Sequence, residues 1–169
     1  MSESIEVRRL GPEDADLARE TIRAIKTGEE SSDAPSLPLA TLQTWLSRAS
    51  NILITATHDS LPVGFALGYL LDRVDQVRPM LFFYEIEVVA TYRRKGIGSR
   101  LVEALKSVAR ERDALKMWVQ TDPGSIAARA LYRHTGGVEC GNPDLLYVWT
   151  YRDNGAPESP PRSDDPPKG

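Results

Sequence analysis

YEIEVVATYRRKGIGSR, residues 84–100, is the stretch of this chain that constrains its fold most strongly. Its first half alternates carboxylates with apolar residues, a pattern typical of a strand. Its second half is a basic turn with two glycines, and apolar residues recur at helical spacing beyond it. The pattern predicts a strand over 80–89 and an amphipathic helix over 96–112. The apolar stripe of that helix is Ile97, Leu101, Leu105 and Val108.

The turn has the composition of an anion-binding loop. Free backbone N–H groups at a helix start attract anions, glycines permit close backbone approach, and basic side chains add charge-assisted contacts. We therefore expect a pyrophosphate here, with an exposed basic turn as the alternative. A Walker loop is excluded because no Gly-x-x-x-x-Gly-Lys-Ser/Thr occurs. The expected cradle consists of Arg93, Arg94, Lys95, Gly96, Ile97, Gly98, Ser99 and Arg100.

The remaining pattern predicts a single α/β domain with a central mixed, twisted sheet flanked by about four helices. The strands at 80–89 and 115–121, joined by a helix, should run parallel. The domain would span residues 1–152, and the Pro/Ser/Asp-rich tail 153–169 would be disordered. Further strands are expected over 5–10, 51–58, 63–71 and 145–151, and further helices from Pro12, over 40–49 and over 125–135.

Composition narrows the functional class. The chain has 169 residues and a net charge of -3, so one globular domain without a nucleic-acid surface is expected. No apolar run approaches the ~20 residues of a membrane span, and no leader pattern is seen, so a cytoplasmic location away from membranes is expected. Cys140 is the only cysteine, and His58 and His134 have no ligand spacing, so no metal is expected.

Two motifs resemble those of a known family. Arg-x-x-Gly-x-Gly at 93–98 joins the predicted strand to the helix, and SIAARALYRHTG follows at 125–136. They resemble the acetyl-coenzyme A motif and the Asn-x-x-Ala-x-x-Leu-Tyr-x-x-x-Gly-Phe segment of the GCN5-related N-acetyltransferase (GNAT) superfamily. Ser125 replaces the usual asparagine, and Gly137 replaces the usual phenylalanine. The resemblance covers roughly residues 5–151.

A narrower likeness is to the aminoglycoside 3-N-acetyltransferases of the gentamicin and fortimicin type. It is carried by FYEIEV at 83–88, WVQTD at 118–122 and ALY at 130–132. The acid at the position of Glu85 is commonly aspartate in that group, and the extra methylene moves the carboxylate by about 1.5 Å. The likeness implies acetyl transfer to a cationic aminoglycoside, with the 3-amino group of deoxystreptamine favoured and antibiotic resistance as the consequence.

The resemblance implies direct transfer of acetyl from the thioester of acetyl-CoA to an amine. A protonated amine cannot attack, so a base must take its proton. Glu85 is the first choice of base and Glu87 the second, and their alternation with apolar residues places both on one face of the strand. Glu87 could instead pair with a nearby arginine.

The resemblance also assigns contacts to the rest of the cofactor. Backbone groups of Ile86, Glu87 and Val88 would hold the pantetheine arm like an added strand. Ser125 belongs to the second motif and is expected to contact the cofactor. Tyr132 would protonate, or hydrogen-bond to, the leaving thiolate; the alternative is a core tyrosine on a helix.

Acidic residues elsewhere are expected to line the acceptor site, because carboxylates steer a polycation. The alternatives are that Asp122 caps the next helix and that the acidic loop near residue 30 is merely solvated. The expected acceptor contacts are Glu29, Glu30, Asp33, Tyr84, Glu85, Asp122 and Asp144. The three tryptophans, Trp45, Trp118 and Trp149, are interpreted as core or interface residues.

Other functions stay open at the level of the sequence. The same chemistry could serve a polyamine or a protein amine. A different class would be a non-catalytic acyl-CoA-binding module, although the presence of Glu85 and Tyr132 argues against it. Related enzymes are often dimers, so a homodimer that uses the last strand is a further expectation.

Overall fold

The computed structural model of the protein describes residues 5–26 and 37–139. The chain divides into two units, residues 1–138 and 139–169, and every described helix and strand belongs to the first unit. The predicted end of the domain at residue 152 lies outside the described residues and stays a prediction.

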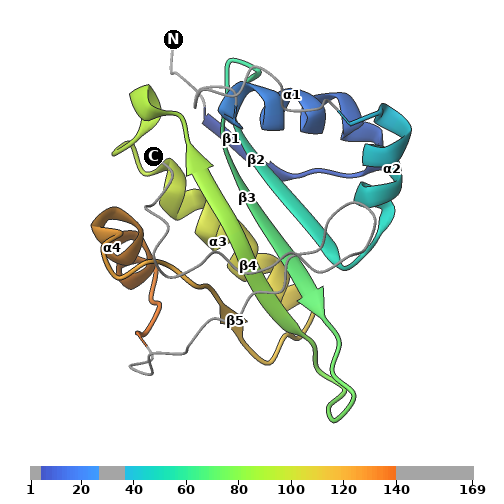
Figure 1. The fold of residues 1–169 in the computed structure, drawn as a ribbon, viewed down its shortest axis with the longest axis vertical. Helices are drawn as coiled ribbons and strands as arrows, with labels where there is room; N and C mark the ends of the chain where they lie inside the picture. Colours follow the sequence, from blue (N-terminus) through green and yellow to red (C-terminus); the bar gives the residue numbers. More distant parts are fainter. Residues whose placement is uncertain (1–4, 27–36, 140–169) are drawn as a thin grey trace, which may run out of the picture. The chain divides into compact units, whose positions relative to one another are not determined.

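Five strands form one mixed sheet in the order β1-β2-β3-β4-β5. Neighbours are antiparallel except β4 and β5, which run parallel, as predicted from the helix that joins them. β4 therefore has an antiparallel neighbour on one side and a parallel one on the other (Figure 1). The bounds are β1 Ile5–Arg9, β2 Asn51–His58, β3 Leu61–Leu71, β4 Met80–Val88 and β5 Met117–Trp118.

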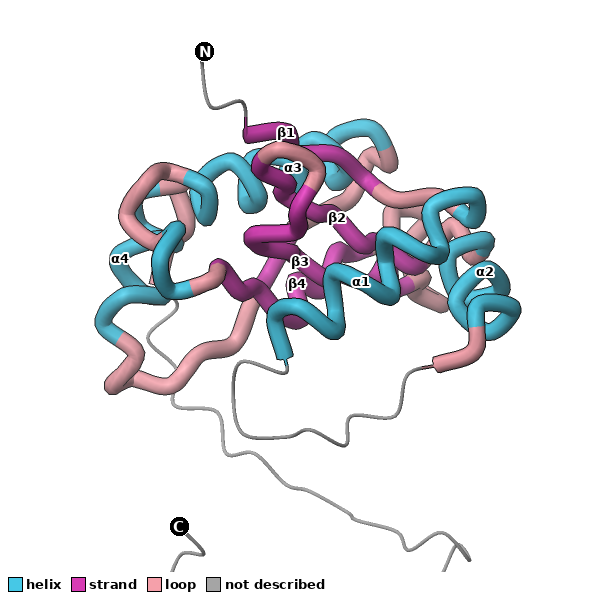
Figure 2. The backbone as a smooth tube through the Cα atoms, turned by 90° about the horizontal axis from the view of Figure 1, so that it is seen from above, coloured by secondary structure: helices cyan, strands magenta, loops and turns pink. Residues whose placement is uncertain are grey.

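Helices cover both faces of the sheet. α1 and α2 pack against one face and α3 against the other (Figure 2). α4 contacts α3. The predicted fold class, an α/β domain with a mixed sheet and about four helices, is confirmed. The bounds are η1 Pro12–Asp14, α1 Ala15–Lys26, α2 Leu39–Ser47, η2 Ala90–Tyr92, α3 Ile97–Glu111 and α4 Ile126–His134.

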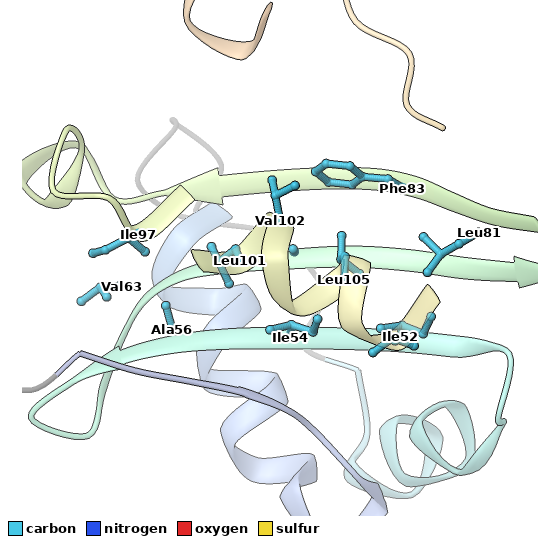
Figure 3. Packing of buried hydrophobic residues seen from close by; sticks show 12 residues of the cluster. Ile52, Ile54, Ala56, Val63, Leu81, Phe83, Ile97, Leu101, Val102 and Leu105 are labelled. Carbon is cyan, nitrogen blue, oxygen red and sulfur yellow. The ribbon is translucent and has the colours of Figure 1, made fainter. Parts of the chain in front are cut away.

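The core beneath α3 fixes the start of that helix against the sheet. All four residues of the predicted apolar stripe are buried, and they belong to one cluster with residues of β2, β3 and β4. Figure 3 shows Ile97, Leu101 and Leu105 in this cluster. Ile97, in the first turn, is 1% exposed, and Phe83 of β4 is equally buried. Side chains packed at crystal-like density transmit small displacements. The N-terminus of α3 is therefore held firmly in relation to β4.

β5 is much shorter than the predicted strand over 115–121. It consists of two half-buried residues, which pair with Leu81 and Phe82 of β4. The prediction of a strand over 115–121 was wrong in length. Leu115 is 40% exposed, and Lys116 and Gln120 are exposed too, so the apolar residues of this segment do not form a continuous buried run. Beyond Trp118 this segment has no strand neighbour among the described residues.

An ion pair joins the end of β1 to η1. Arg8 donates two hydrogen bonds to Asp14, at 2.9 and 2.8 Å, and the Gly11 N–H donates a third at 2.9 Å. The hydrogen bonds from Arg8 lower the pKa of Asp14 below its ordinary value of 3.8. Because the pKa of Asp14 is lower in the folded state than in the unfolded state, the ion pair stabilises the fold above pH 3.8, the ordinary value. This stabilisation is lost as the pH falls through the folded-state pKa.

Asp14→Asn is expected to lower the free energy of unfolding by about 1 kcal/mol at pH 7, since Arg8 is 42% exposed and solvent screens the pair. Urea titrations of both proteins at pH 7 and pH 3 measure the effect. The difference between them should shrink at pH 3. A difference that is the same at both pH values would contradict the assignment.

Candidate active site

β4 contains a β-bulge at Tyr84. The register with β3 skips this residue, which is the extra one between Phe83 and Glu85. A bulge shifts the alternation of side chains by one position. Phe83 packs toward α3 before the bulge, and Ile86 does so after it. Tyr84 and Glu85 consequently share the opposite face, on which α1 and α2 lie.

Glu85 and Glu87 stand on this face of β4. They lie directly opposite Leu67 and Phe65 of β3, which belong to the core beneath α1 and α2. Both glutamates are half-buried. Carboxylates are the side chains that accept charge-assisted hydrogen bonds from an ammonium group, so this face has the chemistry to bind an amine.

The edge of β4 beside these carboxylates is open. β5 pairs only with Leu81 and Phe82, so the segment from Tyr84 to Val88 has no strand neighbour on that side among the described residues. Such an edge can bind an extended ligand as it would bind another strand. The residues predicted to hold the pantetheine arm lie in this segment.

The loop after β4 contains two left-handed residues. Gly96 is the N-cap of α3 with a φ of +78°, and a Cβ there would meet nothing within 4 Å. Conformation rather than space therefore requires glycine. Arg94 has a φ of +64°. No side chain caps α3, so the N–H groups of its first turn, in Ile97 to Ser99, can bind an anion.

The basic side chains of the loop are anchored around this helix start. Arg93 Nε donates to the carbonyl of Val88 at 2.9 Å. Lys95 Nζ lies 5.0 Å from the ring centre of Tyr92. The Tyr92 hydroxyl lies 2.9 Å from His58 Nδ1 at the end of β2. Arg94 and Arg100 are exposed, as are Arg93 and Lys95, so the whole basic group faces solvent.

Gly98 brings α3 close to α4. A Cβ at this position would lie 3.3 Å from Leu131 Cδ2, which is tighter than ordinary van der Waals contact. The absence of a side chain thus allows the first turn of α3 to approach α4. The sequence predicts that this glycine allows close approach of a ligand, and the packing against Leu131 supplies a second reason for glycine here.

Tyr132 of α4 meets β4 close to the bulge. Its ring lies 5.6 Å from that of Phe83, in an edge-to-face arrangement. The side chain is half-buried, and burial raises the pKa of its phenol above 10.0. The phenol is therefore protonated at neutral pH and can donate a hydrogen bond. This position combines partial core packing with a polar group available for chemistry.

The turn before α4 uses the other predicted residues of this region. Asp122 Oδ1 accepts a hydrogen bond from the Gly124 N–H at 2.6 Å, and the Asp122 carbonyl accepts one from the Ser125 N–H. Ser125 is the N-cap of α4, without a side-chain cap hydrogen bond. The carboxylate of Asp122 therefore shapes the entry to α4, and its contact with the acceptor stays a prediction.

Several predicted residues lie outside the described part of the chain. They are Glu29, Glu30, Asp33, Cys140, Asp144, Trp149 and the expected strand over 145–151. Within residues 5–26 and 37–139, no cluster of acidic, histidine or cysteine side chains could hold a metal ion. No helix in this part is long and apolar enough to cross a membrane.

The chain belongs to the acetyltransferase (GNAT) family, because the model of that family matches residues 19–136. Among curated proteins, no sequence matches the chain. The protein is accordingly an acetyl-CoA-dependent N-acetyltransferase.

Solved structures with the same fold include several aminoglycoside acetyltransferases. One from an uncultured soil metagenomic sample, solved in complex with sisomicin, is 22% identical over 86% of this chain and 97% of its own, with a TM-score of 0.76. A second from such a sample is 26% identical over 86% and 99%, with a TM-score of 0.74. The aminoglycoside N-acetyltransferase AAC(6')-Iy, in complex with CoA, is 19% identical over 88% and 96%, with a TM-score of 0.69.

The described residues fit the cofactor of the family. The uncapped start of α3 and the exposed basic side chains at 93–100 suit a diphosphate. The open edge of β4 suits the amide-containing pantetheine arm, which can hydrogen-bond as a strand does. The fit thus rests on two separate features, one electrostatic and one formed by the backbone.

Proposed function

We propose that the enzyme acetylates an aminoglycoside, at the 3-amino group of its deoxystreptamine ring, and so confers antibiotic resistance. The observation that carries the proposal is the pair of half-buried carboxylates, Glu85 and Glu87, beside the open edge of β4. A polycationic acceptor matches their charge. The relative that was solved with sisomicin supports the same class of acceptor.

Glu85 acts as the base in this proposal. It takes a proton from the acceptor ammonium, directly or through water, and the free amine becomes the nucleophile. Glu87, on the same face, holds positive charge of the acceptor close to this base. Tyr84, next to Glu85, contacts the acceptor, and Asp122 is a further contact in this proposal.

Tyr132 acts as the proton donor. Acetyl-CoA supplies the acetyl group as a thioester, and its thiolate is the leaving group. The Tyr132 phenol, kept protonated by burial, donates a hydrogen bond or its proton to the sulfur. The backbone of Ile86 to Val88 and the α3 start hold the cofactor in place while the proton moves.

A thiol-release assay tests the proposal. The full chain is mixed with acetyl-CoA and, in turn, gentamicin, sisomicin, spermidine or a short peptide with a free N-terminus. Faster release with the aminoglycosides is expected, with a product heavier by one acetyl group on the 3-amino nitrogen. Preference for spermidine or for the peptide would show that the acceptor is a polyamine or a protein amine and not an aminoglycoside. Binding of acetyl-CoA without release of thiol to any amine would indicate a non-catalytic module.

Tyr132→Phe is expected to lower kcat by about 10-fold to 10²-fold, because a thiolate needs less help to leave than an alkoxide. The KM for the aminoglycoside should change little, since the phenol serves the sulfur. Steady-state kinetics measure both constants. The wild type should not lose activity through this phenol below pH 10, because its pKa is raised. An unchanged kcat in the variant would show that Tyr132 contributes to packing and not to proton transfer.

A further inference from the structure

A continuous row of aromatic rings runs across four elements of the fold. Trp45 of α2 meets Tyr69 of β3 at 6.1 Å, and Tyr69 meets Tyr84 at 5.7 Å. Tyr84 meets Phe82 at 5.7 Å, and Phe82 stacks on Trp118 of β5 at 4.3 Å with an angle of 19°. We call these five residues the aromatic row. Each of its members touches the next, so the rings support one another in fixed orientations.

The aromatic row lies on the same face as the carboxylates. Phe82 pairs with Tyr69 across the two strands, and Tyr69 contacts α2 through Trp45. The bulge keeps Tyr84 and Glu85 on this face although they are adjacent in sequence. Tyr84, a member of the row, is therefore next to Glu85, the proposed base, on the same face of the sheet.

The aromatic row extends from the core into solvent, because Trp45 packs against the core beneath α1 and α2 whereas Tyr84 is exposed. The core aromatics Phe65 and Phe83 are at most 1% exposed, whereas Tyr84 is 56% exposed. The other four members of the row are half-buried. A large exposed ring that is already held by two neighbours loses little entropy when a ligand stacks on it. An exposed aromatic ring in a fixed orientation can therefore pack against a ligand.

We infer that the aromatic row binds a saturated ring of the acceptor and so selects amines carried on sugar or cyclitol rings over linear polyamines. The C–H face of such a ring packs on the aromatic faces, and an ammonium at its edge reaches Glu85 and Glu87. Ammonium groups near the rings add cation–π attraction. A flexible linear polyamine satisfies the carboxylates but offers no ring to Tyr84. The inference rests on the proposed function for its acceptor class.

The test compares the binding of two polycations to the full chain by titration calorimetry. Sisomicin is the cyclic probe and spermine the linear one. Tyr84→Leu should raise the Kd of sisomicin about fivefold to tenfold and leave that of spermine within twofold. Tyr84→Phe keeps the ring and should keep the preference for sisomicin. Leu61→Ala removes another exposed apolar side chain, remote from the row, and serves as the control.

The outcomes separate this inference from the proposed function. An equal change for both probes in Tyr84→Leu, or no change for either, would overturn the aromatic row as a selective surface even if sisomicin is acetylated. A selective loss of sisomicin binding would support it even if acetylation is found on another amine class. Loss of the preference in Tyr84→Phe would assign the effect to the hydroxyl, not the ring, and would also overturn it.

Discussion

Glu85→Gln is expected to lower kcat for an aminoglycoside by about 10²-fold or more, the size of effect typical of losing a general base. The amide has nearly the same shape, so the affinity for acetyl-CoA should stay nearly unchanged. The loss should shrink as the pH approaches the pKa of the acceptor amine, because more acceptor is then unprotonated and needs no base. Rates by thiol release and affinity by calorimetry measure the two quantities separately.

Two further variants locate the base. Glu85→Asp restores the carboxylate one methylene shorter, as is common in the resembling 3-N-acetyltransferases, and should recover part of kcat. Glu87→Gln should raise the KM for the acceptor more than it lowers kcat, because Glu87 is proposed to hold charge. If kcat collapses in Glu87→Gln but not in Glu85→Gln, the base is Glu87. Wild-type turnover in Glu85→Gln would remove Glu85 from the mechanism.

Gly98→Asp is expected to weaken acetyl-CoA binding about 10²-fold. Position 98 is in the first turn of α3, where a carboxylate competes with a bound diphosphate for the same N–H groups. A like charge about 5 Å away costs about 3 kcal/mol at an effective dielectric constant near 20. The deficit should shrink at high ionic strength because salt screens it. Titration calorimetry with CoA at two salt concentrations measures both effects.

Gly98→Asn is the matched control, since both side chains meet Leu131 in the same way. The asparagine variant should lose less than tenfold in affinity. Equal losses in the two variants would show that crowding against α4, not charge, causes the defect. Thermal melts of both proteins should be compared first, because displacement of α4 would lower their midpoints together.

The strand, turn and helix around residues 84–100 were predictable because each has a strong local signal. Alternation marks β4, glycines with basic residues mark the turn, and helical spacing marks α3. The parallel pairing of β4 with β5 followed from the connecting helix. These features depend on neighbours in sequence, which is what a single chain reveals.

The bulge and the aromatic row were not predictable. A bulge depends on which residues of β3 face β4, and the plain alternation of strand 80–89 predicts no skipped residue. The prediction that the tryptophans are core or interface residues is confirmed for Trp45, which packs against the core beneath α1 and α2, but it does not reveal the ring contacts of Trp45 and Trp118. Trp45 contacts a ring 24 positions away in the chain, and Trp118 contacts one 36 positions away. The aromatic residues of 82–84 were the only sequence signal that could have suggested such a surface.

Because β5 pairs with only two residues of β4, the rest of that edge of β4 has no strand neighbour among the described residues. An exposed strand border is a template for unwanted self-association, and natural domains shield such borders. In this enzyme, bound acetyl-CoA would cover the open edge of β4. A ligand present at a hundred times its Kd adds about 2.7 kcal/mol to native-state stability. We therefore expect acetyl-CoA at high concentration to stabilise the folded enzyme and to limit its self-association. Without acetyl-CoA, the enzyme should unfold and self-associate more readily.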